Sequence, residues 1–220
     1  MSTKLKIIKQ GVISFNKSSF GTVTLFEIAQ SLGISRGNLT YHFKDKKVLL
    51  KAILEDMLEK MEVQRKKSRS LPSFENLHNE VQLYFKFQKT YSFIFRDSQV
   101  LKLPYVNKKF KEMTAQTILD NQAAIAFSIQ LGNMKPEPFP GIYNNLAVMT
   151  WVLSFYWSAQ NIVRNTSKNE DGEKVIWSLL LPHFTPKGVK AFKNYFGENY
   201  FNQMGEAFQF DINKWSSDWQ

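Results

Sequence analysis

Apolar residues recur at three- and four-residue steps along most of the chain, which is the spacing of one buried face of an α-helix. The pattern predicts helices over residues 4–17, from residue 24, over 36–43, from 45 to about 70, over 73–89, in a short aromatic piece to about 98, and over 105–132, 139–164, 171–182 and 186–203. No convincing run of alternating strand residues appears. The sequence therefore predicts an all-α protein.

Two short helices are predicted close together near the N-terminus. Thr24 and Glu27 have the spacing of a capping box, in which a threonine and a glutamate stabilise a helix start. Gly33 suits the left-handed residue just after that helix, and Ser35 can cap the next one. Only Gly33 and Ile34 then remain as the turn. Two short helices joined this tightly are typical of a helix-turn-helix.

The second of these helices has one apolar face and one polar face. Leu39 and Phe43, four positions apart, are expected to pack inward. The side chains expected to face outward are Arg36, Asn38, Thr40 and Tyr41. Arginine can bond guanine, asparagine can bond adenine, and threonine offers a hydroxyl and a methyl group to thymine. The alternative is that residues 41–43, an aromatic pair around a histidine, only fill a small core.

Gly37 lies inside this helix, where glycine costs about 1 kcal/mol relative to alanine. A compensating gain is expected. Close approach of the backbone to a phosphate or a base would supply it.

Charge is concentrated in the first third of the chain. Residues 1–70 contain 14 Lys and Arg against 6 Asp and Glu, whereas the whole chain has a net charge of +10. This asymmetry favours a polyanionic partner, either nucleic acid or an anionic membrane surface. Residues 65–70, RKKSRS, are interpreted as the solvated end of the fourth helix. The absence of cysteine and of a signal-peptide pattern favours a cytoplasmic protein.

The run IAQSLGISRGNLTYHFKDKKVLL, residues 28–50, resembles the N-terminal signature of TetR-type transcriptional regulators. The match continues backwards to Phe15 with correct spacing, and residues 91–97 and 179–188 resemble the effector domain of one TetR subgroup. Family members commonly have glycine at the position of Ser19, a polar residue at Phe26 and an aromatic residue at Thr40. The resemblance implies a helix-turn-helix DNA-binding domain at 1–46, a helical effector-binding and dimerisation domain at 47–205, and a tail at 206–220.

The resemblance also implies roles for individual residues. The positions of the phosphate contacts are Thr24, Tyr41, His42 and Lys46, and the base-facing positions are Arg36, Gly37, Asn38 and Thr40. His42 has an alternative role as a partly buried imidazole that fixes the helix orientation. The implied partners are double-stranded DNA with a pseudo-palindromic operator, a small apolar effector and a second copy of the chain.

The second part of the chain supplies candidates for the effector pocket and the dimer interface. Aromatic residues make up 15% of the sequence, and the pocket implied by the family is placed at three pairs of residues four apart: Tyr84 with Gln88, Met113 with Thr117, and Trp151 with Phe155. Residues 138–163 contain no charge, and their asparagine, serine and glutamine residues argue against a membrane span. We expect one face of this helix to pack on the core and the other to be covered by a partner subunit. The dimer interface is therefore placed on residues 139–164 together with parts of 171–200.

Catalysis finds little support in the sequence. The three histidines are scattered, and no Walker A, G-x-S-x-G or dinucleotide-binding string occurs, so neither a cofactor nor a metal site is expected. The leading hypothesis is a ligand-responsive DNA-binding repressor. Two alternatives are a helical enzyme or carrier for a hydrophobic metabolite, and a basic peripheral membrane protein.

Overall fold

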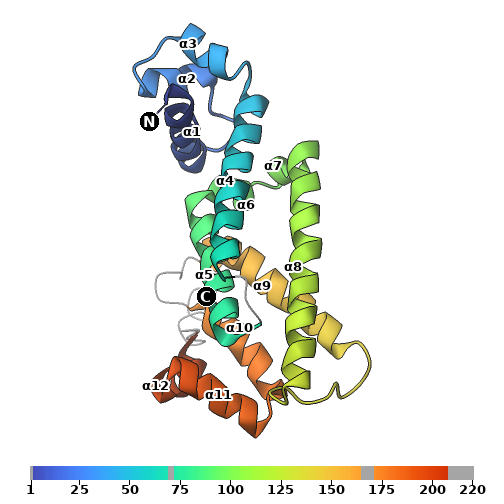
Figure 1. The fold of residues 1–220 in the computed structure, drawn as a ribbon. Helices are drawn as coiled ribbons and strands as arrows, with labels where there is room; N and C mark the ends of the chain where they lie inside the picture. Colours follow the sequence, from blue (N-terminus) through green and yellow to red (C-terminus); the bar gives the residue numbers. More distant parts are fainter. Residues whose placement is uncertain (1, 69–71, 165–170, 208–220) are drawn as a thin grey trace, which may run out of the picture. The chain divides into compact units, whose positions relative to one another are not determined.

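A computed structural model describes residues 2–68, 72–164 and 171–207, and every regular element within these ranges is a helix (Figure 1). The α-helices are α1 (Thr3–Ser18), α2 (Leu25–Ser31), α3 (Arg36–His42), α4 (Lys46–Ser68), α5 (Phe74–Thr90), α6 (Ser92–Arg96), α7 (Ser98–Lys102), α8 (Pro104–Gln130), α9 (Ile142–Arg164), α10 (Gly172–Leu180), α11 (Pro186–Phe196) and α12 (Glu198–Asn202). Two 3₁₀ helices, η1 (Leu181–His183) and η2 (Met204–Ala207), complete this part of the chain. The prediction of an all-α fold is confirmed.

Two backbone breaks alter the predicted helices. The short aromatic piece predicted to end at about residue 98 is α6, which ends because Asp97 adopts an extended conformation; the carboxylate of Asp97 caps α7, a helix that was not predicted, by accepting the N–H of Gln99. The helix predicted over 186–203 is two helices. Gly197 has a φ of +89°, which breaks the helix and separates α11 from α12.

Contacts divide the chain into two compact units. The first unit comprises Met1–Arg69 with Leu83–Gln116, and the second comprises Ser70–Gln82 with Thr117–Gln220. The first unit therefore contains the three N-terminal helices together with α4, α6 and α7. The functional division at residue 46 remains a prediction.

The three N-terminal helices enclose a small apolar core that α4 completes. Its most deeply buried members are Ile7, Phe15, Ile28, Leu39, Phe43 and Leu49. Gly11 allows α1 to approach α4 closely, because a Cβ at this position would lie 3.1 Å from Cδ1 of Ile53 and 3.2 Å from Cδ2 of Leu49. Helix α3 is therefore held in place by the close packing of Leu39 in this core.

A single amide joins α1 to the start of α6 within the first unit. Nδ2 of Asn16 donates to the carbonyl of Thr90 at 2.8 Å. Its Oδ1 accepts the hydroxyl of Ser92 at 3.0 Å and the backbone N–H of Phe93 at 3.1 Å. The ring of Phe93 also lies 5.2 Å from that of Phe15. The helix-turn-helix region is therefore bonded to the chain that follows α5.

The second unit has an aromatic core with a buried carboxylate at its edge. Trp177 is 1% exposed and Phe192 is 0% exposed, and their ring centres are 5.1 Å apart. Glu173, on α10, is 2% exposed and accepts hydrogen bonds from three side chains. The donors are Nδ1 of His78 at 2.7 Å, Nε2 of Gln82 at 2.7 Å and Nε1 of Trp177 at 3.0 Å. This network satisfies a charge that would otherwise be costly to bury.

Candidate DNA-binding surface and effector region

The turn between α2 and α3 has the predicted geometry. Thr24 and Glu27 form the complete capping box, and Gly33 has a φ of +64°. Ser35 caps α3 by accepting the N–H of Asn38 at 3.1 Å. The helix-turn-helix prediction is therefore confirmed in its local structure.

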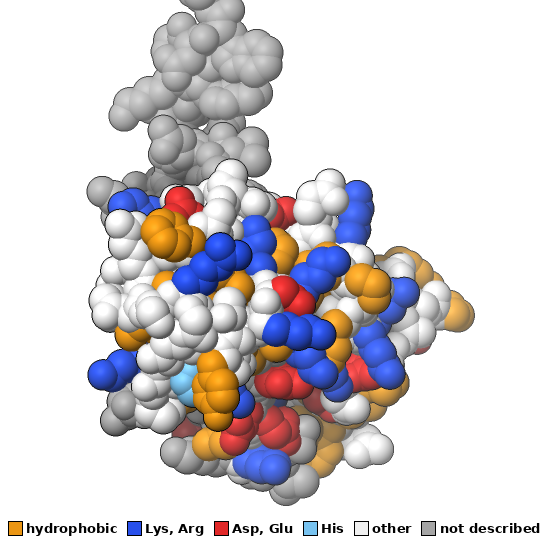
Figure 2. Space-filling view, turned by 90° about the horizontal axis from the view of Figure 1, so that it is seen from above, with side chains coloured by type: hydrophobic (Ala, Val, Ile, Leu, Met, Phe, Trp, Pro, Cys, Tyr) orange, Lys and Arg blue, Asp and Glu red, His pale blue; other side chains and the backbone are white. Residues whose placement is uncertain are grey.

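The two faces of α3 differ sharply in burial. Leu39 is 0% exposed and Phe43, which follows the helix, is 1% exposed. The side chains of Arg36 and Asn38 are exposed, and Tyr41 is 85% exposed. Figure 2 looks down on the end of the chain that carries α2 and α3, where many lysine and arginine side chains lie on the face, with acidic and apolar ones between them. This helix can present several hydrogen-bonding groups to a partner without disturbing its core.

Two of the predicted contact residues of α3 have partners within the protein or only partial exposure. The hydroxyl of Thr40 donates to the carbonyls of Arg36 at 3.0 Å and Gly37 at 3.1 Å, so its remaining capacity for DNA is as an acceptor and through its methyl group. Thr40 is half-buried. His42 is also half-buried, with its ring centre 5.2 Å from that of Tyr41.

Thr24 is exposed, but its polar groups take part in the capping box. Its backbone N–H donates to Oε2 of Glu27 at 2.7 Å and its hydroxyl donates to the same oxygen at 2.8 Å. These two hydrogen bonds lower the pKa of the Glu27 carboxyl, and the nearby ammonium of Lys46 adds to the effect. A carboxylate is therefore held at the point where α2 begins.

Lys46 is half-buried and bonded to the turn between α1 and α2. Its Nζ donates to the carbonyl of Gly21 at 2.9 Å and to that of Val23 at 2.9 Å. The sequence did not reveal these bonds, because nothing in residue spacing indicates which backbone carbonyls a distant lysine will reach.

The predicted effector residues of the first unit are buried. Tyr84 is 1% exposed, Gln88 is 0% exposed and Met113 is 9% exposed. Nη2 of Arg65 donates to the hydroxyl of Tyr84 at 2.7 Å. Arg65 is therefore half-buried, whereas Lys66, the next residue of the predicted solvated helix end, is exposed, and residues 69–70 lie outside the described residues. The position of Arg65 eight and four residues after Met57 and Met61, both buried, is the signal that could have placed it on the inner face of α4.

The predicted effector residues of the second unit are Thr117, Trp151 and Phe155. Thr117 is 4% exposed and Phe155 is 3% exposed. The rings of Trp151 and Phe155 lie 5.5 Å apart on α9. Nε1 of Trp151 is buried, with no hydrogen-bond partner among the described residues.

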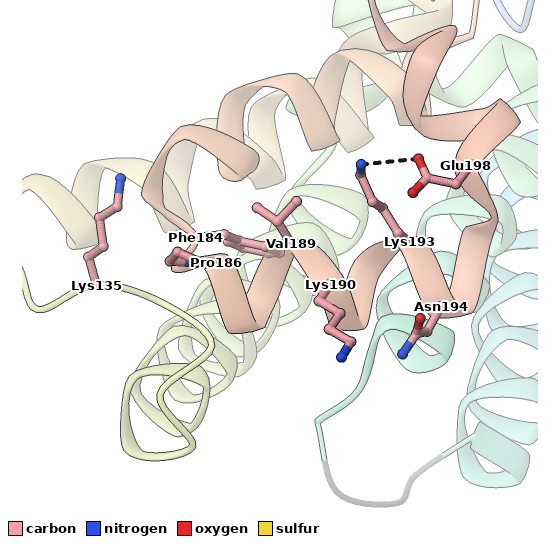
Figure 3. Close-up of a pocket in the computed structure, with 8 residues that line it drawn as sticks. All are labelled: Lys135, Phe184, Pro186, Val189, Lys190, Lys193, Asn194 and Glu198. Carbon is pink, nitrogen blue, oxygen red and sulfur yellow. Dashed lines mark ion pairs between the residues drawn. The ribbon is translucent and has the colours of Figure 1, made fainter.

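A surface groove that the sequence did not indicate lies along α11 (Figure 3). It has a volume of about 720 Å³ and is lined by Lys135, Phe184, Pro186, Val189, Lys190, Lys193, Asn194 and Glu198. Two of its lysines have partners within the protein: Lys135 donates to the carbonyl of Pro182, and Lys193 is paired with Glu198 at 3.0 Å. The groove is open to solvent, and its lining carries three lysines against one glutamate.

One face of α9 exposes apolar side chains. Val148, Met149, Val152 and Tyr156 are between 39% and 49% exposed. The opposite face is buried in the second unit, with Leu146 at 3% and Ala147 at 0% exposed. Trp157 is half-buried. Its ring packs against Gly172, where a Cβ would lie 2.5 Å from the indole.

Within residues 2–68, 72–164 and 171–207, no helix combines the length and the apolar character needed to cross a bilayer. Over the same ranges, histidine and carboxylate side chains do not gather in groups of three that could hold a metal ion.

Comparison with known proteins matches two adjoining parts of the chain to one family. A family profile for TetR, described as "Bacterial transcriptional repressor", matches residues 53–192. A second profile, described as "Bacterial regulatory proteins, tetR family", matches residues 7–53. No curated protein sequence matches the chain.

Solved structures of other regulators have a similar fold. A TetR-family regulator from Marinobacter aquaeolei VT8 is 22% identical, with 87% of this chain and 96% of that chain covered and a TM-score of 0.77. The ketosteroid regulator KstR2 of Mycobacterium tuberculosis is 14% identical, with coverages of 84% and 96% and a TM-score of 0.64. The complex of SmeT with triclosan is 16% identical, with coverages of 84% and 93% and a TM-score of 0.63. Since one profile covers more than half of the 220 residues and the other covers the helix-turn-helix, the chain belongs to the TetR family of transcriptional regulators.

Proposed function

We propose that this regulator is a homodimeric repressor that binds a pseudo-palindromic operator and leaves it when a small apolar effector binds. It acts in the cytoplasm, where its DNA is found. The observation that carries the proposal is the division of α3 into a buried apolar face and an exposed face with Arg36, Asn38 and Tyr41. A short helix of this kind, held on a packed base, fits the major groove.

The contacts are proposed to divide into two classes. Arg36, Gly37, Asn38 and Thr40 face the bases, and Thr24, Tyr41, His42 and Lys46 contact phosphates. Phosphate contacts set the position of the protein on the duplex, whereas base contacts supply sequence specificity. The excess of positive charge in residues 1–70 supports a strong electrostatic contribution.

Dimerisation is proposed to use the exposed apolar face of α9. Val148, Met149, Val152 and Tyr156 form one stripe on a helix whose other face belongs to the core. Large apolar side chains that gather on one surface mark an interaction site. A two-fold dimer would bring two copies of α3 to successive half-sites of the operator.

The effector is proposed to be apolar and to contact residues from the set Tyr84, Gln88, Met113, Thr117, Trp151 and Phe155. These side chains combine aromatic and aliphatic surface with a few polar groups, which is the usual composition of a small-molecule site. SmeT has been solved with triclosan, and KstR2 is named as a ketosteroid regulator, so two relatives of similar fold are associated with apolar molecules.

Selection of bound DNA from a random pool tests the function directly. We expect one pseudo-palindromic sequence to be enriched. Asn38→Ala should then lose about 1–3 kcal/mol of binding free energy on the selected DNA and little on random DNA. Asn199→Ala, which removes an exposed amide on α12, is the matched control.

Two results would contradict the proposal. Equal losses on both DNAs for Asn38→Ala would remove the assignment of base readout to α3. Binding to anionic vesicles with no preference among DNA sequences would favour the peripheral membrane protein. TetR regulators are generally not enzymes, and an enzyme or carrier of a hydrophobic metabolite would likewise show no sequence-selective DNA binding.

A further inference from the structure

The indole N–H of Trp151 is a buried donor without an acceptor in the described part of the chain. Tryptophan N–H groups usually find a partner when they are buried. In the same unit Nε1 of Trp177 has one, because it donates to Oε1 of Glu173 at 3.0 Å. A buried donor that lacks a partner bears the full cost of its lost hydration. An acceptor from outside the chain would remove this cost.

Two hydrogen bonds show how α9 lies against the second half of α8 (Figure 1). Nδ2 of Asn121 donates to the carbonyl of Ala147 at 3.1 Å, and Nε2 of Gln122 donates to Oδ1 of Asn144 at 3.0 Å. The partner numbers rise along α9 as they fall along α8. The two helices are therefore antiparallel where they meet, and we call this contact the α8–α9 seam.

Trp151 occupies the next level of the α8–α9 seam. It follows Ala147 by one helical turn on α9, and Thr117 precedes Asn121 by one turn on α8. Thr117 is 4% exposed, and Phe155, whose ring centre lies 5.5 Å from that of Trp151, is 3% exposed. The unpartnered donor therefore belongs to a buried region with aromatic surface.

Neither helix brings a cation to this level of the seam. Helix α8 has no lysine or arginine after Lys111, and α9 has none before Arg164. The hydroxyls of Thr150 and Ser154, both 4% exposed, donate to carbonyls within α9. A carboxylate or phosphate buried here would find no countercharge on α8 or α9, whereas an uncharged acceptor needs none.

We propose that Trp151 donates its indole N–H to a carbonyl oxygen of an uncharged, otherwise apolar effector. This inference rests on the proposed function, which places the effector at a set of residues that includes Trp151. Phe155 supplies aromatic surface for the body of the molecule, and Trp151 supplies one directional polar contact, which is how small-molecule sites usually combine affinity with specificity. Trp151 therefore selects a ketone over a hydrocarbon of the same shape and over a charged analogue.

Matched pairs of compounds test this selection. Benzophenone and diphenylmethane differ by one carbonyl, as do fluorenone and fluorene, and benzoylbenzoate adds a negative charge to the first ketone. Dissociation constants are measured by calorimetry for the wild type and two variants. Trp151→Phe should reduce the preference for each ketone over its hydrocarbon about tenfold, because the donor is lost and the aromatic ring is kept. Trp157→Phe, the matched loss of an indole on the same helix, should leave this preference within a factor of about two.

Nuclear magnetic resonance of the indole N–H groups reports the hydrogen bond itself. The Trp151 signal is the one absent from Trp151→Phe. Its proton resonance should move downfield when benzophenone binds, as expected for a new hydrogen bond, and should not do so with diphenylmethane. This readout separates a hydrogen bond from a general effect of the substitution on packing.

Four results would overturn the proposal. The first is an unchanged ketone preference in Trp151→Phe, and the second is failure of both ketones to bind the wild type. The third is tighter binding of benzoylbenzoate than of benzophenone, which would contradict the uncharged class. The fourth is a magnetisation transfer from bound water to the Trp151 N–H that persists with benzophenone present, which would assign the donor to an ordered water.

Operator binding distinguishes this inference from the proposed function. If benzophenone binds through Trp151 but leaves operator affinity unchanged, release by an effector at this site fails and the assignment of the donor stands. If a screened compound releases the operator while the Trp151 resonance stays in place, the assignment fails and the proposed function stands.

Discussion

Gly37 lies inside α3, where no neighbouring atom of the protein requires a glycine. The nearest atom to a Cβ at this position would be Oγ of Ser35, 3.9 Å away. Alanine would therefore fit the free protein and stabilise the helix by about 1 kcal/mol. We expect Gly37→Ala to raise the thermal unfolding temperature and to weaken operator binding at least tenfold, because the methyl group would stand where the DNA approaches. Unchanged operator affinity in this variant would mean that α3 is not the helix that lies against DNA.

The capping box of α2 makes stability depend on pH. Hydrogen bonds from the backbone and the hydroxyl of Thr24 lower the pKa of the Glu27 carboxyl from its ordinary value of 4.5. The carboxylate therefore stabilises the fold above the unfolded pKa, and this contribution is lost as pH falls through the lower folded pKa. Between pH 6 and pH 3, Glu27→Gln should flatten the decline in unfolding free energy, measured by denaturant titration. Glu59→Gln, an exposed change on α4, should retain the slope of the wild type.

At the residue scale, sequence predicted what depends on local spacing and missed what depends on tertiary contacts. Leu39 is fully buried, as its position on the helix predicts. Thr24 and Ser35 cap their helices because each is a hydroxyl residue that lies three positions before the backbone N–H it accepts. The bonds of Lys46 to Gly21 and Val23 span more than twenty residues, so no local pattern contains them.

At the scale of elements, Asn16 is the main polar connection between α1 and α6. Its side-chain amide makes hydrogen bonds to Thr90, Ser92 and Phe93. Asn16→Ala should destabilise the protein by about 1–3 kcal/mol, because it leaves partly buried donors and an acceptor without partners. Lys17→Ala, an exposed change next to it, should stay within about 0.5 kcal/mol of the wild type. Equal unfolding free energies for the two variants would show that the connection is dispensable.

The exposed stripe on α9 gives a specific test of dimerisation. Val152 is 39% exposed, so a glutamate there leaves the core of one chain intact but places a charge in the proposed interface. Val152→Glu should weaken the dimer at least tenfold in sedimentation equilibrium at micromolar concentration. Val63→Glu, at a residue of α4 that is 50% exposed, is the matched control and should remain dimeric. A wild-type protein that sediments as a monomer would remove the interface assignment. Trp157 is a poorer choice, because its contact with Gly172 belongs to the fold of one chain.

The spacing of apolar residues predicted where the helices lie, but it did not predict where all of them end. The apolar period continues through the junction at Gly197, so sequence alone merged α11 with α12, whereas the predicted aromatic piece ended near residue 98 and missed α7. The breaks depend on backbone conformation at a single residue, which hydrophobic spacing does not report. For the same reason, the pattern could assign α9 an inner and an outer face but could not show which of its aromatic residues pack within one chain.

For the whole molecule, the central question is whether effector and operator binding are coupled. The proposed effector residues and α3 are far apart in sequence, and the proposal requires that the effector bind the DNA-bound and the free form with different affinities. Thermodynamic linkage then fixes the result: operator DNA must weaken effector binding by the same factor by which the effector weakens DNA binding. A coupling of about 1–3 kcal/mol corresponds to factors of roughly 5 to 150.

The measurement is a titration of an apolar compound identified by thermal-shift screening, by calorimetry with and without the selected operator. We expect the dissociation constant of the compound to rise when the operator is present. Random DNA of equal length should raise this constant less, because it lacks the specific contacts. Phe155→Ala should reduce compound binding while leaving operator affinity within a factor of about three, since Phe155 is proposed to contact the effector and not the DNA. A dissociation constant that operator DNA leaves unchanged would show that the compound occupies a site with no part in regulation.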